Sequence, residues 1–545
     1  MRKRIICSIL SLVFLVAIGA ACAGDGGGAG SGPNSGWNVL EHPWDTPYPE
    51  TVSFTTAVFE MGHMTIPHGG THENNIWIDW YKDKMNAEMI VDWVSAEYET
   101  QMNLAIAAGT LPDIFFVNNS QFVQLLEADA LADLSDYYPA LASPKVQLLQ
   151  NVDPTILNSG KKDGKLYGIP RLGWGNSVET PGLIFFRHDW WTELGSLVPE
   201  SLDDVEYIVR RMNEEFGAKG IALDFKNFDA PLINLMSSWH AYPRLWLRTS
   251  NGIEFGGIQP EVRTALEFLA GWYKEGLLDP EFAGKDMDQS IEGILNNQHG
   301  AHFMWQWGGW YPGADMVRTN GPESWLRPFI LPSADGQQLK FPIRFDNGGE
   351  YMVVNKNYAN PDVLVKVLSI HTHAIEDSYP ESLTLDEFYA FTANDFAHWS
   401  PIRLNNPLDE YNRYLEIQYA LANDINMQLT VPYADVYLAD TLAWLEEGSA
   451  DGLGSAIQAG IPQQSVYYLT EPFFIFNDWY VRCAMWGFPP DEYLRLNTIL
   501  ESLLIEGYTQ IIMGTQPIES FDTLVTNWKA AGGDEVTAAV NAAFG

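Results

Sequence analysis

The stretch EYETQMNLAIAAGTLPDIFFV, residues 97–117, contains a helix, its stop signal and a strand in direct succession. Residues 97–108 place apolar side chains at helical spacing, and Gly109 follows as the stop. We expect this helix to bury four side chains, Met102, Leu104, Ala105 and Ala108. Residues 112–117 then form an apolar run that is typical of a strand. The stretch therefore predicts the helix-to-strand step from which α/β proteins are built.

The same alternation continues on both sides of this stretch. A β-branched run predicts a strand at 51–58, and a second strand is expected at 88–94. A helix from about Asn74 separates these two strands, and residues 119–128 predict a further helix. Strands separated by short helices indicate βαβ units and a parallel sheet.

The pattern restarts further along the chain. Residues 182–186 are typical of a strand, and a Ser-x-x-Asp capping box at 201–204 opens a long amphipathic helix. Pro260 opens another helix, which ends at Gly276, and from about residue 380 the pattern is mainly helical. A chain of 545 residues is too long for one compact core, so we expect two or three domains.

Composition indicates a folded and strongly acidic protein. Hydrophobic residues make up 46% of the chain and aromatic residues 13%, which is typical of a globular protein. The 31 basic and 70 acidic residues give a formal net charge of −39. This charge repels nucleic acid and anionic lipid headgroups, so we expect no nucleic-acid partner.

The N-terminus has the features of an export signal. Basic residues 2–4 precede an apolar run, residues 5–21, which is too short to favour a membrane span. Cys22 follows small residues, and this arrangement resembles the lipobox of bacterial lipoproteins, in which the cysteine is acylated. Gly19 stands where the lipobox usually has Leu. Residues 23–48, rich in Gly, Ser, Asn and Pro, are expected to be a flexible linker.

Cysteine content limits covalent cross-linking. The chain has three cysteines, Cys7, Cys22 and Cys483. Cys7 leaves with the signal and Cys22 is expected to be acylated, so Cys483 has no partner for an intramolecular disulfide. Its apolar surroundings predict a buried, structural side chain.

Several segments resemble the sugar-type extracellular solute-binding proteins (family 1) of ABC importers, and they occur in the family's order. They are LAIAAGTLPDI (104–114), DGKLYGIP (163–170), FRHDWWTELG (186–195), PESLDD (199–204), WYKEGLLDPEF (272–282), YTQIIMG (508–514) and WKAAGGD (528–534). The resemblance covers nearly the whole mature chain.

The resemblance implies an α/β, two-lobed, periplasmic-binding-protein-like fold of type II, with parallel-sheet lobes joined by hinge crossings. Its implied boundaries are a signal at 1–21, a lipidated Cys and linker at 22–48, lobe 1 at 49–168 with about 351–405, and lobe 2 at 169–350 with about 406–545. It implies no catalysis and no cofactor. It further implies a monomer that captures an oligosaccharide by lobe closure and delivers it to the transmembrane subunits of a permease. The lipid anchor would hold it on the extracellular face of a bacterial cell membrane, Gram-positive by expectation.

Sugars present apolar ring faces and belts of hydroxyls, which aromatic rings and bidentate polar groups bind well. The chain has 20 tryptophans, and many of them, such as Trp80, Trp93 and Trp272, are expected in the core. The segment WQWGGW (305–310) cannot bury all its rings in one short element. The tryptophans that we expect at the ligand are Trp305, Trp307 and Trp174, with Trp239 and Trp246 as further candidates.

Some polar candidates follow predicted strands, because ligands of α/β sheets bind at the carboxyl ends of strands. Those that follow a strand are Asn118, Asn119 and His63. Asn347 and Glu350 precede residues 351–354, which look like the second crossing of the family, and Arg187 matches the family's Arg-x-Asp. Asn119 or Ser120 could equally serve as a helix N-cap. An anionic sugar would need basic side chains, for which Arg171, Arg187, Arg244, Arg248 and Arg344 are available.

Other functions were weighed on their own motifs. His63, His68 and His72 cluster as in metal sites, but two glycines between the latter pair disfavour the helix that this spacing needs. A secreted glycoside hydrolase needs two carboxylates roughly 5 to 10 Å apart, and no stretch singles out such a pair. A surface adhesin or lectin would show repeated β modules, which the pattern lacks. A peptide ligand is the remaining alternative to a sugar.

Overall fold

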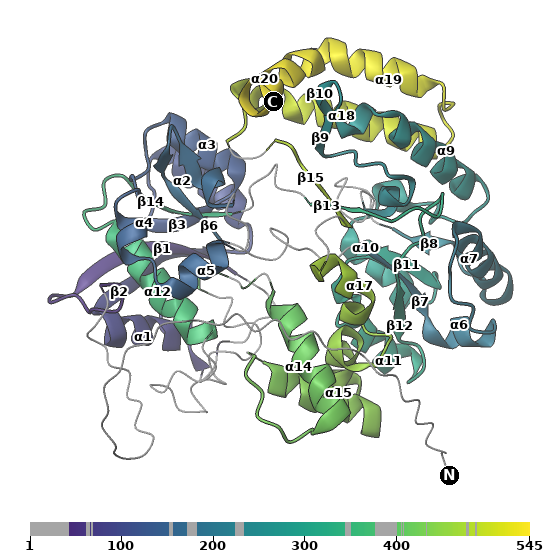
Figure 1. The fold of residues 1–545 in the computed structure, drawn as a ribbon, viewed down its shortest axis with the longest axis horizontal. Coiled ribbons are helices and arrows are strands. Elements are labelled where there is room, and N and C mark those ends of the chain that lie inside the picture. The colour runs from purple at the N-terminus through teal and green to yellow at the C-terminus, as the bar shows by residue number, and fades with distance from the viewer. Residues whose placement is uncertain are drawn as a thin grey trace, which may run out of the picture.

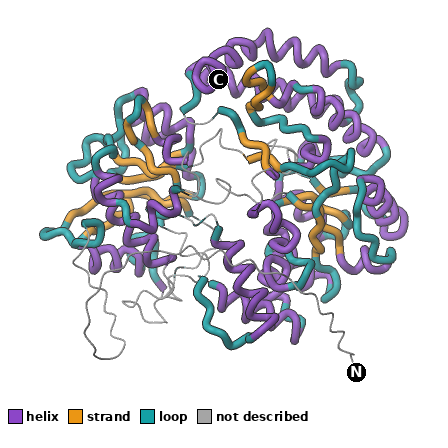
Figure 2. The backbone as a smooth tube through the Cα atoms, viewed as in Figure 1, coloured by secondary structure: helices purple, strands orange, loops and turns teal. Residues whose placement is uncertain are grey.

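The computed structural model describes residues 43–60, 66, 69–151, 156–171, 182–223, 234–343, 350–376, 400–404, 406, 408–431, 433–475, 479–485 and 488–545. Figure 1 shows two lobes, with the purple-to-blue N-terminal elements in one and the teal and yellow elements in the other. Strands lie in the interior of each lobe and helices surround them (Figure 2).

Lobe 1 combines the N-terminal part of the chain with a later return. Its elements are β1 (Val52–Phe59), α1 (Ile76–Met85), β2 (Ala87–Ser95), α2 (Tyr98–Ala108), β3 (Ile114–Val117), α3 (Asn119–Glu127), α4 (Tyr137–Leu141), α5 (Pro144–Gln150), β4 (Lys161–Lys162), β5 (Lys165–Leu166), β6 (Gly168–Pro170), β14 (Tyr351–Val354) and α12 (Asp362–Glu376).

Lobe 2 contains the remaining elements. The first group is β7 (Leu183–Arg187), α6 (His188–Glu193), α7 (Leu202–Phe216), β8 (Ile221–Ala222), β9 (Trp246–Thr249), β10 (Gly252–Phe255), α9 (Pro260–Lys274), α10 (Met287–Leu295), β11 (Ala301–Met304), α11 (Gly313–Asn320), β12 (Leu326–Phe329) and β13 (Phe341–Ile343). The second group is α14 (Asp409–Asn423), α15 (Ala434–Glu447), α16 (Leu453–Ser455), α17 (Val466–Ile475), β15 (Tyr480–Arg482), α18 (Asp491–Ile512), α19 (Ser520–Trp528) and α20 (Asp534–Phe544).

Residues 97–117 fold largely as expected. Helix α2 ends at Gly109, which adopts the left-handed conformation with φ 68° that glycine tolerates best, and β3 is buried along its whole length. The predicted buried face was partly wrong. Leu104 is 60% exposed, because the face that packs inward is formed by Tyr98, Met102 and Ala105.

The prediction of purely parallel sheets was also wrong. In lobe 1, β1 and β2 are parallel, but β14 lies between β3 and β6 and is antiparallel to both. In lobe 2, β7 is antiparallel to β11 and β12, and β8 is parallel to β11. The sheets are mixed because strands that carry the chain into and out of a lobe are inserted against the direction of their neighbours.

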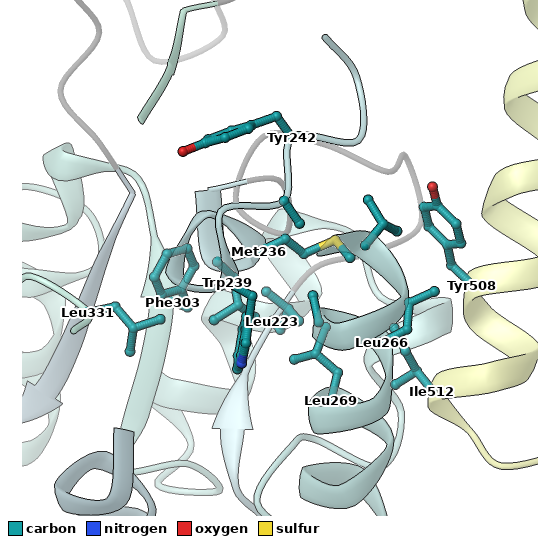
Figure 3. Close-up of a cluster of buried hydrophobic side chains, with 14 of the residues drawn as sticks. Leu223, Met236, Trp239, Tyr242, Leu266, Leu269, Phe303, Leu331, Tyr508 and Ile512 are labelled. Atoms are coloured by element: carbon teal, nitrogen blue, oxygen red, sulfur yellow. The ribbon is translucent and has the colours of Figure 1, made fainter. Parts of the chain in front are cut away.

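Each lobe has its own hydrophobic core. The lobe 1 core includes the fully buried Trp77 and Tyr81 of α1 together with residues of β14 and α12. In lobe 2, one cluster joins the sheet to α7, α9 and the C-terminal helices. Figure 3 shows side chains of this cluster from β11, α9 and α18 among those that it labels. Among the residues that the structure describes, no helix combines the length and the apolar character needed to cross a bilayer.

The chain passes between the lobes several times. It leaves lobe 1 after Arg171 and reaches β7 of lobe 2, and it leaves β13 to return to lobe 1 at Glu350. Strand β15 pairs with β13 between the two lobes. Tyr480 of β15 packs against the core of lobe 1, whereas the next residue, Val481, packs against the core of lobe 2.

Candidate ligand-binding site

Strand register brings three sequence candidates to one edge of the lobe 1 sheet. Tyr351 of β14 lies opposite Val117 of β3 on one side and Pro170 of β6 on the other. The residues that follow β3 and β6, and the one that precedes β14, are therefore neighbours. They are Asn118, Arg171 and Glu350, and we call this the lobe 1 edge. Two passages between the lobes begin or end here.

An arginine and a carboxylate form an ion pair at the lobe 1 edge. Arg171 Nη1 lies 2.6 Å from Glu350 Oε2, and the backbone N–H of Arg171 donates to the carbonyl oxygen of Glu350 at 2.9 Å. The Arg171 side chain is 7% exposed, whereas that of Glu350 is 48% exposed. Glu350 thus presents a carboxylate to solvent at the point where the chain re-enters the lobe.

The guanidinium of Arg171 packs on a stack of two aromatic rings, those of Phe116 and Tyr98. It lies 4.3 Å from the ring centroid of Phe116, and this ring stacks on Tyr98 at 4.0 Å with an interplanar angle of 4°. Burial raises the pKa of Tyr98 far above its usual value, so its hydroxyl stays neutral and donates to the carbonyl of Phe116. The stack fixes Arg171 in one orientation, because cation and ring attract each other over the ring face.

Asn118 has a structural task as well. It is the N-cap of α3: its side-chain oxygen accepts from the backbone N–H of Gln121 at 3.0 Å, and the Gln121 side chain accepts from the Asn118 N–H. The cap is therefore Asn118, one residue before Asn119 and two before Ser120, the positions considered from sequence. Asn119, the first residue of α3, is half-buried.

The lobe 2 sheet has a corresponding edge, which holds the tryptophan segment. Leu183, where β7 begins, lies opposite Met304, where β11 ends. Trp305 follows directly, so it stands at the edge that the chain reaches on arriving from lobe 1. We call the start of β7 and the residues after β11 the lobe 2 edge. Trp305 and Trp307 are both half-buried, and Trp307 packs against a core cluster.

The tryptophan segment continues as a 3-10 helix, Gln306–Gly309, and residues later in the chain contact this segment. The Gln458 side-chain amide donates to the carbonyl oxygen of Gln306 at 2.6 Å. Trp310 packs over Gly454, where an added Cβ would lie 1.8 Å from its ring, and it meets Tyr437 edge-on at 5.6 Å. Trp310 and Tyr437 extend the aromatic surface from the lobe 2 edge to α15.

A cluster of charged side chains at the start of α14 lies next to Tyr437. Arg413 pairs with Asp409 and with Glu410, the latter at 2.8 Å, and its guanidinium lies 4.5 Å from the ring centroid of Tyr437. Burial raises the pKa of Asp409 to about 6, opposed by the charges of Arg413 and of Lys145 on α5. Since α5 belongs to lobe 1, the start of α14 lies within electrostatic reach of the other lobe.

Three sequence candidates lie away from these edges. Arg187 is at the far end of β7; it is 3% exposed, donates twice to Asp189 and stacks on Trp190. Trp239 is 5% exposed and packs with Trp272 inside lobe 2, as Figure 3 shows for its ring among buried leucines.

Trp246 is 1% exposed and packs against Phe255. These interior positions leave Arg187, Trp239 and Trp246 no surface to offer a ligand. The proposed site therefore omits them.

Other candidates lie outside the described residues. They are His63, Trp174, Asn347 and the lipidation residue Cys22. Arg344 and His68 lie outside them too. Within the part of the chain that the structure describes, no group of three or more His, Cys, Asp or Glu side chains is arranged to hold a metal ion. Cys483 is buried, as predicted.

Sequence reasoning missed several residues of the two edges. It named Arg171 only as one of five available cations, and it did not single out Trp310, Tyr437 or Arg413. A usable signal existed for Arg171, since it directly follows DGKLYGIP (163–170), one of the segments that resemble the family. For Tyr437 and Arg413 no local signal existed, because α14 and α15 reach the site only through long-range packing.

Comparison with known proteins places this fold in a family. The profile of the bacterial extracellular solute-binding proteins matches residues 89–369. This chain belongs to that family. Its members bind a solute, so the prediction that the chain is not an enzyme is confirmed, and the glycoside hydrolase alternative is set aside.

Individual relatives are distant. Lipoprotein LipO of Bacillus subtilis (strain 168) is 21% identical over 488 residues, which are 83% of this chain and 86% of that protein. Among solved structures, the alginate-binding protein AlgQ2 without calcium ion has a TM-score of 0.59 at 15% identity and covers 91% of this chain and 98% of its own.

A second similar structure is the HMO binding ABC-transporter associated solute binding protein from Bifidobacterium longum infantis. Its TM-score is 0.59 at 15% identity, covering 90% of this chain and 98% of that one. FusA of S. pneumoniae in complex with kestose also has a TM-score of 0.59, at 13% identity and with the same coverage. These likenesses confirm the mixed α/β periplasmic-binding-protein fold.

Proposed function

We propose that this protein is the oligosaccharide receptor of an ABC importer, tethered by a lipid on Cys22 to the outer face of a Gram-positive cell membrane. One observation carries the proposal. The ion pair Arg171–Glu350 and the residue Trp305 stand at two sheet edges, and the passage of chain from β6 to β7 connects these edges. A ligand held between these edges would touch both lobes.

The chemistry of the edges supports a sugar. Trp305 and Trp310 offer aromatic faces for the apolar side of a ring. Glu350 and Asn119 offer a carboxylate and an amide that exchange hydrogen bonds with hydroxyls. Three proteins with the same fold are described as binding alginate, HMO or kestose, which agrees with this assignment.

The mechanism is closure of one lobe on the other. A ligand shifts such an equilibrium only by the contacts that it makes in the closed state and lacks in the open state. Aromatic contacts from lobe 2 and polar contacts from lobe 1 supply this difference. The closed form is then the state that the permease recognises.

A thermal-shift screen of oligosaccharides on the full chain tests sugar binding. We expect at least one sugar to raise the melting temperature by about 2 °C or more at a concentration of about 100 times Kd, because a ligand of the native state stabilises it by mass action. Hydrolysis of a sugar in place of a shift, or a shift with peptides alone, would contradict the proposal.

The tether is tested by fractionating cells that express the C22A variant. We expect the variant to leave the membrane fraction and appear in the medium, because acylation needs the Cys22 thiol. Cys483→Ala is the matched control and should stay with the membrane, since Cys483 is buried in lobe 2. Retention of the Cys22 variant in the membrane would refute lipid anchoring at this residue.

A further inference from the structure

The side chains that pair with the cations at the two edges indicate which ligand charge these edges would accept. At the lobe 1 edge, the Arg171 guanidinium is engaged by Glu350 at 2.6 Å and by the face of Phe116. Its Nε atom is buried, and the side chain is 7% exposed. The exposed member of the pair is the carboxylate. A ligand that approaches this edge therefore meets an acceptor of hydrogen bonds before it meets a free positive charge.

The cations next to the lobe 2 edge are matched in the same way. The Arg413 guanidinium is shared between Asp409 and Glu410, and its side chain is 3% exposed, against 43% for Glu410. Lys145 of lobe 1 acts on the same Asp409 across the lobes. At this cluster two carboxylates share one guanidinium, and, as at the lobe 1 edge, the more exposed group is an acid.

Other arginines that an anionic sugar could have used are engaged elsewhere. Arg187 is held by Asp189, Arg244 pairs with Glu501, and Arg248 donates to the carbonyl oxygen of Phe544 at 2.7 Å. Arg244 and Arg248 lie beside the C-terminal helices α18 and α20, not at the sheet edges. A uronate would have to compete with a bound carboxylate for Arg187 and Arg244, and with a backbone carbonyl oxygen for Arg248.

We propose that the ligand is an uncharged oligosaccharide, selected by carboxylates that face it from both lobes, Glu350 from lobe 1 and Glu410 from lobe 2. This inference rests on the proposed function. A carboxylate accepts hydrogen bonds from two neighbouring hydroxyls of a neutral sugar, whereas a uronate brings a like charge against it and is disfavoured. The formal net charge of −39 acts in the same direction at long range.

The test measures Kd for matched sugars on the full chain by calorimetry. The probes are oligogalacturonate and alginate oligosaccharides, their carboxyl-reduced neutral counterparts, and neutral malto-, xylo-, manno- and fructo-oligosaccharides. We expect binding to be confined to neutral sugars, with any uronate at least about tenfold weaker than its reduced counterpart. Uronates that bind more tightly than their reduced forms would overturn this inference and leave the proposed function intact. Failure of every sugar would overturn both.

The variant Glu350→Gln tests whether the charge of Glu350, and not the shape of the site, causes the preference for a neutral sugar over its uronate form. Removing this acid leaves the Arg171 guanidinium without its ionic partner, so the preference for a neutral sugar over its uronate form should shrink by about tenfold. Glu275→Gln removes the acid of an exposed ion pair with Arg210 on the surface of lobe 2 and should leave the preference unchanged. An unchanged preference in Glu350→Gln, with the protein folded by circular dichroism, would overturn the role of Glu350.

Discussion

Replacing Trp246 by alanine is expected to lower the free energy of unfolding of lobe 2 by about 3 to 5 kcal/mol, the usual range for a buried Trp or Phe truncated to alanine. Trp246 is 1% exposed at the start of β9. Its ring packs at 5.1 Å from Phe255, which in turn stacks on Trp528 at 5.0 Å. The truncation therefore removes contacts that join the β9–β10 hairpin to the C-terminal helices.

Urea unfolding followed by far-ultraviolet circular dichroism measures this change. Trp305→Ala is the comparison variant, and it should change the free energy of unfolding by less than about 1 kcal/mol, because Trp305 is only half-buried and has more room to adjust. The two residues were given the same role from sequence. A loss below about 1 kcal/mol for Trp246→Ala, together with weaker sugar binding, would return Trp246 to the ligand site.

Local patterns predicted the elements of this protein well. The capping box Ser201–Asp204, with its helix Leu202–Phe216, and the proline that opens α9 all appear in the structure. Each depends on residues within a few positions of one another, which sequence spacing records directly. The same is true of Gly109, whose left-handed conformation ends α2.

Strand direction and burial were harder, because they depend on partners far away in sequence. β14 follows β3 by more than two hundred residues and separates it from β6, and no feature of residues 351–354 signals antiparallel pairing. Trp239 and Trp305 are chemically identical, but only the packing of α9 over the former decides that it is interior. Residue type thus indicates what chemistry a side chain could offer, and tertiary contacts decide whether that side chain is interior or lies at a sheet edge.

In the proposed site, the two edges divide the work of binding unequally. Asn118, Arg171 and Phe116 in lobe 1 are all engaged with each other or with their own helix, so this edge is rigid before a ligand arrives. Preorganisation reduces the entropy lost on binding, which favours lobe 1 as the lobe that holds a ligand first. The rings of lobe 2 then add contacts that exist only after closure.

Trp305→Ala is therefore expected to weaken the Kd for the bound sugar by about 30-fold, which corresponds to about 2 kcal/mol, the size of an interface hot spot. The ring stands directly after β11, at the edge that faces the passage from lobe 1. Its loss removes one of the aromatic faces of the lobe 2 edge. Trp307 packs against the core and Trp310 is fixed over Gly454, so neither ring can move into the vacated position. Calorimetry with the sugar found in the screen measures the change.

Two further variants make this result specific. Trp305→Phe keeps a ring and should recover part of the lost affinity, since stacking depends on an aromatic face. Trp190→Ala removes another half-buried tryptophan, which lies on α6 beyond the far end of β7 and stacks on Phe216. This variant should bind the sugar with an unchanged Kd while its stability falls. Equal losses of affinity in Trp305→Ala and Trp190→Ala would show that the Kd for the sugar depends on the stability of lobe 2 as a whole. The assignment of Trp305 to the ligand site would then be wrong.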